Sequence, residues 1–171
     1  MFYDHMFYDH IDSPIGRILL AGNGDALTFI GLPESRHPFA IPPEWRREAS
    51  AFETARMQFA AYFDGTLQRF SLDLAPCGTP FQLRVWDALS GIAYGETISY
   101  AELARRIGQP TASRAVGLAN GANPLSIIVP CHRVIGASGA LTGYGGGLSA
   151  KRFLLDHERR HMDVPAFALG G

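Results

Sequence analysis

The sequence predicts an α+β fold in two parts: a small N-terminal domain with an antiparallel sheet and a helix, then a mostly helical C-terminal domain. Short apolar runs separated by turn residues fill the first part, whereas apolar residues at helical spacing dominate the second. The composition changes at residues 75–78, Ala-Pro-Cys-Gly. We therefore expect residues 1–76 and 79–171 to form the two domains.

In the N-terminal domain we expect three strands, a proline-rich loop and a helix, followed by a further strand. These elements are residues 7–12, 16–21, 26–32, 32–45, 49–63 and 70–74. Ser13-Pro14 and Gly22-Asn23-Gly24 supply the turns between the strands. The first ten residues repeat Met-Phe-Tyr-Asp-His, and we assign no architecture to this duplication.

In the C-terminal domain we expect four helices, each preceded by a side chain that can cap its first turn. The helices are residues 80–89, 100–107, 112–119 and 150–158, and their caps are Thr79, Ser99, Thr111 and Ser149. Gly108-Gln109-Pro110 joins the second and third helices into a helix-turn-helix. Ser138-Gly139 predicts a turn before a glycine-rich loop over residues 142–147.

Composition places the chain among ordinary globular proteins, with 47% hydrophobic and 18% charged residues in 171. No apolar run approaches the roughly 20 residues that span a bilayer, and no secretory signal opens the chain, so we expect a cytoplasmic protein. Its two cysteines, Cys77 and Cys131, are expected to be free thiols, and their spacing indicates no zinc site.

Charge is unevenly distributed along the chain. Residues 99–161 contain eight basic and three acidic residues, so this segment carries +5 although the whole chain carries −1. A basic segment of this kind favours contact with a polyanion, although an arginine-rich surface is often merely solvated.

Cys131 and His132 form the most informative pair. They follow the apolar run Ile127–Val129, which predicts an interior strand whose end would hold the cysteine. A thiol reacts as thiolate, and a nearby imidazole is its usual base. A buried structural cysteine beside an incidental histidine is the alternative.

The second helix of the helix-turn-helix is unusual for a helix that reads bases. Apart from Ser113 and Arg114, residues 112–119 are small or apolar. Such a helix has few donors for base edges, so we expect DNA binding without sequence preference. Plain core packing of the two helices is the alternative.

These features occur together with Asn123-Pro124, a Tyr144 glycine loop and a final helix carrying Glu158. Together they resemble the O6-alkylguanine-DNA alkyltransferases, which repair DNA by direct reversal. The resemblance is dense from Thr79 to Arg160 and loose before it. It implies a helix-turn-helix of winged-helix type and irreversible transfer of an alkyl group from O6 of guanine, and also from O4 of thymine, to Cys131.

The resemblance also implies a role for each matched residue. Cys131 accepts the alkyl group, His132 takes the thiol proton through a water, and Glu158 holds His132. Tyr100 donates a hydrogen bond to the leaving guanine, and Asn123 ties the recognition helix to the active-site turn. The DNA-binding residues are Arg114, which fills the gap left by the flipped nucleotide, with Ser113, Ala115, Gly117, Ala119 and Asn120. The substrate pocket is formed by Val134, Tyr144, Ser126 and Gly145.

The implied partner is double-stranded DNA containing O6-alkylguanine, bound by a monomer without a cofactor. Some family members carry a zinc site, but the N-terminal half has only Cys77, so we expect no metal. Ser126 stands where some members have proline, which would alter the pocket. A cysteine hydrolase using Cys131 and His132 and a non-catalytic sensor of alkylated DNA are the alternatives.

Overall fold

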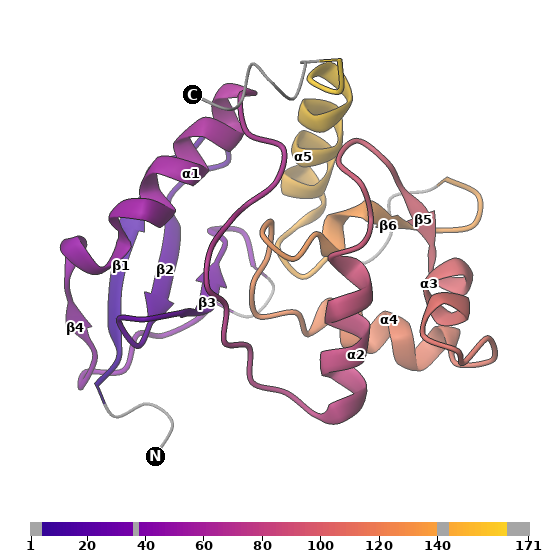
Figure 1. The fold of residues 1–171 in the computed structure, drawn as a ribbon, viewed down its shortest axis with the longest axis horizontal. Helices are drawn as coiled ribbons and strands as arrows, with labels where there is room; N and C mark the ends of the chain where they lie inside the picture. Colours follow the sequence, from indigo (N-terminus) through magenta and orange to yellow (C-terminus); the bar gives the residue numbers. More distant parts are fainter. Residues whose placement is uncertain (1–4, 36–37, 140–143, 164–171) are drawn as a thin grey trace.

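The N-terminal half forms a four-stranded sheet (Figure 1). In the computed structural model, which describes residues 5–35, 38–139 and 144–163, the sheet consists of β1 Phe7–Ile11, β2 Ile18–Gly22, β3 Leu27–Gly31 and β4 Arg46–Arg47. The order is β3-β2-β1-β4; β2 runs antiparallel to β1 and β3, and β4 is parallel to β1. The three expected strands and their antiparallel pairing are confirmed.

One helix covers this sheet. A 3-10 turn, Ala49–Phe52, leads into α1, Glu53–Asp64, so the predicted helix is confirmed. Gly65, with φ of 86°, ends α1 in the left-handed region. Phe59 and Tyr62 are almost fully buried on the inner side of α1.

The strand predicted over residues 70–74 is wrong. This segment meets β3 at one point, where the Leu27 amide donates to the Asp73 carbonyl and the Ala75 amide donates to the Leu27 carbonyl. Two hydrogen bonds around one residue make a bridge, which is too short to be a strand.

The C-terminal half is mostly helical. Its elements are α2 Pro80–Leu89, β5 Ile98–Ser99, α3 Tyr100–Arg106, α4 Ser113–Gly121, a 3-10 turn Cys131–Arg133, β6 Val134–Ile135 and α5 Leu148–Arg160. Thr79 forms a capping box with Gln82, and Ser99 accepts from the Glu102 amide, so these two predicted caps are confirmed.

The other two predicted caps are wrong. The chain enters α4 through Ala112, whose side chain has no acceptor, and the Thr111 hydroxyl does not cap the helix. α5 begins two residues earlier than expected, at Leu148, with Gly147 as its N-cap at φ of 99°. Ser149 therefore lies inside the first turn, where its hydroxyl donates to the Glu34 carboxylate at 2.6 Å.

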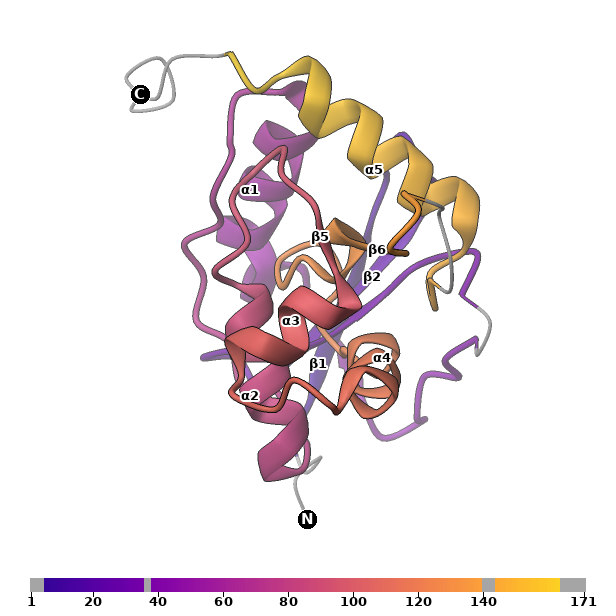
Figure 2. The ribbon, with the colours of Figure 1, turned by 90° about the vertical axis from the view of Figure 1, so that its right-hand side faces the viewer.

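A single apolar cluster joins the two halves. It contains residues from the sheet and α1, such as Leu20 and Phe59, together with Trp86 of α2 and Leu154 of α5. Figure 2 shows α5 crossing above the helix-turn-helix with α1 and the sheet behind it. Side chains from both halves can therefore meet at α5. Within the described ranges, no helix is long and apolar enough to cross a membrane.

Candidate active site

Cys131 is held at the start of a 3-10 turn, Cys131–Arg133, and is 3% exposed. The residues before it do not form the predicted interior strand. Ile127 adopts a φ of 76°, and the Val129 amide donates to the Leu125 carbonyl at 2.9 Å, so the apolar run is a buried tight turn. A β-branched residue at positive φ is strained, and this strain is tolerated because the surrounding contacts fix the turn.

Two asparagines fix this turn. Asn123 Oδ1 accepts from the Leu125 amide at 3.0 Å, and Asn123 Nδ2 donates to the Val129 carbonyl at 2.8 Å. Asn120, near the end of α4, donates to the Cys131 carbonyl at 3.4 Å. Asn120 is therefore the link from α4 to the cysteine, whereas Asn123 closes the turn itself.

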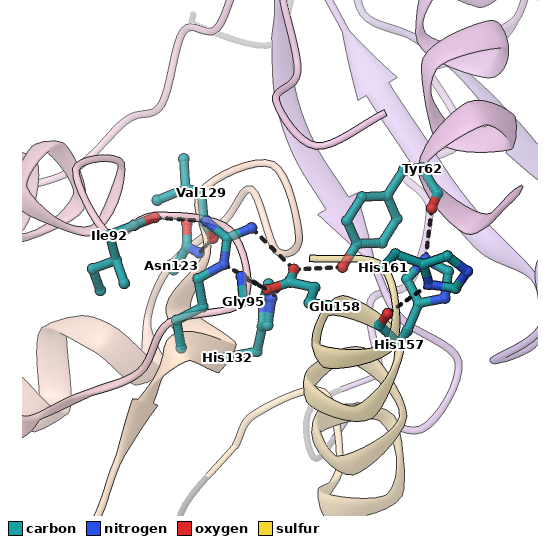
Figure 3. Close-up of polar contacts among 10 residues, drawn as sticks. Tyr62, Ile92, Gly95, Asn123, Val129, His132, His157, Glu158 and His161 are labelled. Atoms are coloured by element: carbon teal, nitrogen blue, oxygen red, sulfur yellow. Dashed lines mark hydrogen bonds and ion pairs between the residues drawn. The ribbon is translucent and has the colours of Figure 1, made fainter. Parts of the chain in front are cut away.

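A buried polar network surrounds Glu158 of α5 (Figure 3). Its Oε2 lies 2.7 Å from His132 Nε2, 2.7 Å from the Tyr62 hydroxyl and 3.0 Å from Arg133 Nη2. Its Oε1 lies 2.8 Å from Arg133 Nε and 3.3 Å from the Gly95 amide. Arg133 also donates to the Ile92 carbonyl at 2.7 Å, so the carboxylate and guanidinium hold each other in a fixed orientation.

The protonation states follow from this geometry. Burial raises the pKa of Glu158, but His132 and Arg133 outweigh burial and hold that pKa well below its usual range. Burial lowers the pKa of His132, and Arg133 and Lys151 lower it further, against the opposing effect of Glu158. At neutral pH the pair is therefore an ionised carboxylate and a neutral imidazole.

An ionised carboxylate only accepts hydrogen bonds, so Nε2 of His132 carries the proton and Nδ1 is left as the basic nitrogen. Nδ1 is buried and has no hydrogen-bond partner among the described residues. His132, which carries this nitrogen, lies in the same 3-10 turn as Cys131.

The Cys131 thiol is weakly acidic in this setting. Burial raises its pKa, and Asn123, Lys151 and Tyr144 reduce the increase without cancelling it. Lys151 is fully buried, and its Nζ donates to the Val134 carbonyl at 2.6 Å. The thiol therefore needs a base to become a nucleophile at neutral pH.

Cys131 lies in the wall of a cavity of about 320 Å³. Ser126, Tyr144 and Gly145 line the same cavity, together with residues 29–32, 35, 39, 120–124 and 146. Gly146 allows the loop to approach Leu32, the residue after β3, because a Cβ there would lie 2.4 Å from Leu32 Cδ1. Residues 142 and 143 of the predicted glycine-rich loop lie outside the described residues.

Two predicted site residues, Tyr100 and Val134, do not line this cavity. Tyr100 opens α3, half-buried, with its ring against α4 at Gly117. Val134 is fully buried in β6; its amide donates to the Cys131 carbonyl, and its own carbonyl accepts from Lys151.

The predicted DNA-binding residues of α4 fall into two groups by their solvent exposure. Arg114 and Ala115 are exposed, and Ser113 and Gly117 are half-buried. Ala119 and Asn120 are 3% and 2% exposed, so their side chains offer no surface to a duplex, and the structure does not support their predicted contact role. Leu118, which the sequence did not single out, is 74% exposed on the outer face of α4.

Sequence reasoning missed three buried residues of this site. Arg133 and Lys151 were counted as surface charge, and Tyr62 was only a member of the apolar face of α1. The available signal was the position of Arg133 directly after Cys131 and His132, in a short run otherwise flanked by apolar residues.

Two family models together match nearly the whole described chain. Residues 6–76 match the ribonuclease-like domain of 6-O-methylguanine DNA methyltransferase, and residues 80–160 match its DNA-binding domain. The chain belongs to the 6-O-methylguanine DNA methyltransferase family.

Curated relatives of this methyltransferase chain are similar over most of their length. A methylated-DNA–protein-cysteine methyltransferase of Methanosarcina acetivorans is 52% identical over 153 residues, which cover 90% of this chain and 98% of the relative. The enzyme of the same name from Mycobacterium tuberculosis is 55% identical over 152 residues, covering 89% and 92%.

Solved structures show the same fold. The Mycobacterium tuberculosis OGT crystallised in complex with DNA superposes with a TM-score of 0.86 at 51% identity, covering 96% of this chain and 99% of that one. An O6-methylguanine DNA methyltransferase from Methanococcus jannaschii gives a TM-score of 0.61 at 27% identity, covering 88% and 93%.

Proposed function

We propose that this protein repairs O6-alkylguanine in DNA by transferring the alkyl group to the Cys131 sulfur. The observation that carries the proposal is a cavity-lining thiol on the same turn as a neutral imidazole, which a buried carboxylate orients. Family membership supports this reading of the geometry.

In the proposed reaction His132 Nδ1 removes the Cys131 proton through a water, and Glu158 keeps the imidazole in the tautomer that leaves Nδ1 free. The thiolate attacks the alkyl carbon, so a sulfur–carbon bond forms as the carbon–O6 bond breaks. The released electron pair goes to the guanine, and a hydrogen bond from Tyr100 lets the base leave without a full negative charge. Asn123 holds the turn that presents Cys131.

The same cavity would hold the alkyl group during transfer. Ser126, Tyr144 and Gly145 would surround the alkyl chain. The main chain at Val134, outside the cavity lining, is the proposed contact for the edge of the base, because its carbonyl has a second lone pair besides the one that Lys151 uses. O4-alkylthymine presents the same bond to the thiol and is the second proposed substrate.

Double-stranded DNA would meet the exposed face of α4, bound by one copy of this chain. Arg114 leads this face, with Ser113, Ala115 and Gly117 beside it. Small side chains permit close approach to the DNA backbone, which suits binding without sequence preference. The division at residues 76–79 is also proposed, supported by the ranges of the two family models. The cytoplasmic location stays a prediction.

Intact mass spectrometry with O6-methylguanine duplex DNA tests the proposed function. We expect each protein molecule to gain one methyl group on Cys131 and then to stop, because a thioether carbon is a poor electrophile. The only other cysteine, Cys77, is exposed, whereas Cys131 is buried. Turnover beyond one equivalent without a mass change would favour a cysteine hydrolase, and binding without a mass change would favour a sensor.

Arg114→Ala is expected to slow repair of duplex DNA and to leave reaction with a free O6-alkylguanine base nearly unchanged. Extruding a nucleotide costs a few kcal/mol of stacking and pairing, and a side chain that fills the gap offsets part of it, so the loss on duplex should be about 10- to 100-fold. Single-turnover rates on both substrates measure the effect.

Arg159→Ala, which removes an exposed arginine of α5, is the matched control and should leave both rates near wild type. Equal slowing of duplex and free base by Arg114→Ala would place Arg114 in support of the pocket and contradict its role in extrusion.

A further inference from the structure

Tyr62 connects the N-terminal half to the reacting residues. It lies in the last turns of α1, fully buried, and its hydroxyl donates to Glu158 Oε2 at 2.7 Å (Figure 3). The two residues are 96 positions apart in the sequence. A hydroxyl placed in an otherwise apolar core requires a partner, and the partner here is the carboxylate that holds His132.

The Glu158 carboxylate is crowded with donors. Its Oε2 is shared by Tyr62, His132 and Arg133, and its Oε1 by Arg133 and the Gly95 amide. A carboxylate offers about four lone-pair sites, so five donors must share them. Each donor at Oε2 withdraws negative charge that would otherwise strengthen the bond from His132 Nε2.

Tyr62 is fixed by a second contact to the same helix. Its backbone carbonyl accepts a hydrogen bond from Nε2 of His157, the residue before Glu158, at 2.6 Å. Its ring packs against those of Phe63, Phe70 and Tyr94. The hydroxyl therefore has a defined position relative to Glu158.

We infer that the Tyr62 hydroxyl is a positioning group for the reaction, which sets the proton affinity of His132 by competing with it for Glu158 Oε2. The inference deepens the proposed function and rests on it, because His132 matters only if it is the base for Cys131. The N-terminal domain would thereby adjust the chemistry of the C-terminal domain through one hydrogen bond.

Other ionisable groups face His132 and Glu158 from neighbouring elements and are unchanged in the Tyr62 variants. They are Tyr94 of the loop after α2, Cys131 and Arg133 of the 3-10 turn, Tyr144 of the active-site loop, and Lys151 and His157 of α5.

Tyr62→Phe tests the inference, because it deletes the hydroxyl and keeps the ring. Losing this donor makes Glu158 accept more strongly from His132, which raises the proton affinity of Nδ1. The acid limb of the alkyl-transfer rate should therefore move to higher pH by roughly half a unit to one unit. The ring ¹⁵N resonances of His132 in the unreacted protein should titrate with the same shift.

Tyr94→Phe is the matched control. The Tyr94 hydroxyl is also buried near this cluster, but it has no hydrogen-bond partner among the described residues, and its ring stacks on Arg133 at 5.6 Å. Deleting it removes the same atom without changing the donors to Glu158, so the acid limb should stay at its wild-type position.

Replacing Tyr62 by 3-fluorotyrosine keeps both the ring and the hydrogen bond, and it should shift the acid limb of the alkyl-transfer rate in the opposite direction. Its phenol is a stronger donor, so the acid limb should move to lower pH. A wild-type acid limb and a wild-type His132 titration in both Tyr62 variants would overturn the inference and reduce Tyr62 to a packing residue. Absence of alkyl transfer in the wild-type protein would instead overturn the proposed function.

Discussion

Cys131→Ser is expected to reduce alkyl transfer by more than about 10³-fold on both duplex DNA and a free O6-alkylguanine base. A hydroxyl is far less acidic than a thiol and is a harder nucleophile. Nδ1 of the neutral His132 imidazole therefore cannot activate it for attack on carbon. The serine side chain is smaller than that of cysteine, so the cavity and the turn should persist. Single-turnover assays followed by intact mass measure the loss.

Cys77→Ser is the matched control, because Cys77 is an exposed free thiol distant from this chemistry in the sequence. It should transfer at the wild-type rate, and Cys131→Ser should still bind duplex DNA. If transfer survives in Cys131→Ser and disappears in Cys77→Ser, Cys77 is the acceptor and the role proposed for Cys131 is contradicted.

Local signals in the sequence predicted most of the secondary structure. Thr79-Pro80 and Ser99 predict where α2 and α3 begin, because a cap depends only on neighbouring residues. Apolar spacing over residues 49–63 predicted the helix that covers the sheet for the same reason. These features depend on contacts within one or two turns of the chain.

The apolar run at Ile127–Val129 shows where local reasoning fails. Three β-branched residues predict a strand, but the Asn123 side chain bonds the Leu125 amide and the Val129 carbonyl and closes the segment between them into a turn. A side chain that replaces backbone partners in this way leaves no signal in hydrophobic periodicity. The prediction that the cysteine ends a buried apolar run nevertheless holds, because Ile127 and Val129 are buried.

The buried charges were not predictable from composition. Arg133 and Lys151 counted toward a basic surface, yet Arg133 pairs with Glu158 and Lys151 donates to Val134 inside the protein. Tyr62 meets Glu158 only because α1 and α5 pack together across the two halves. Partners this far apart in the sequence become visible only in the fold.

Glu158→Gln is expected to lower the free energy of unfolding by about 3–5 kcal/mol, because it leaves Arg133 buried without its counter-charge. The same change should slow alkyl transfer by about 10²-fold or more, since the amide no longer holds His132 as a base. Urea unfolding and single-turnover rates measure the two effects. Glu102→Gln is the matched control: that acid pairs with Arg105 and Arg106 at the surface, where solvent screens the pairs, so its loss should leave stability close to that of the wild type.

The pH dependence of stability separates the charge of Glu158 from its shape. The pKa of Glu158 is lower in the folded protein than its unfolded value of about 4.3, so its stabilisation is present above that pH and is lost as pH falls toward the folded value. His132, whose folded pKa is also lowered, makes stability decline below its unfolded value of about 6.5. Glu158→Gln should therefore flatten the decline below about pH 4.3 and keep the decline near pH 6. A decline below pH 4.3 as steep as in the wild type would show that the Glu158 carboxyl is not held ionised by Arg133 and His132.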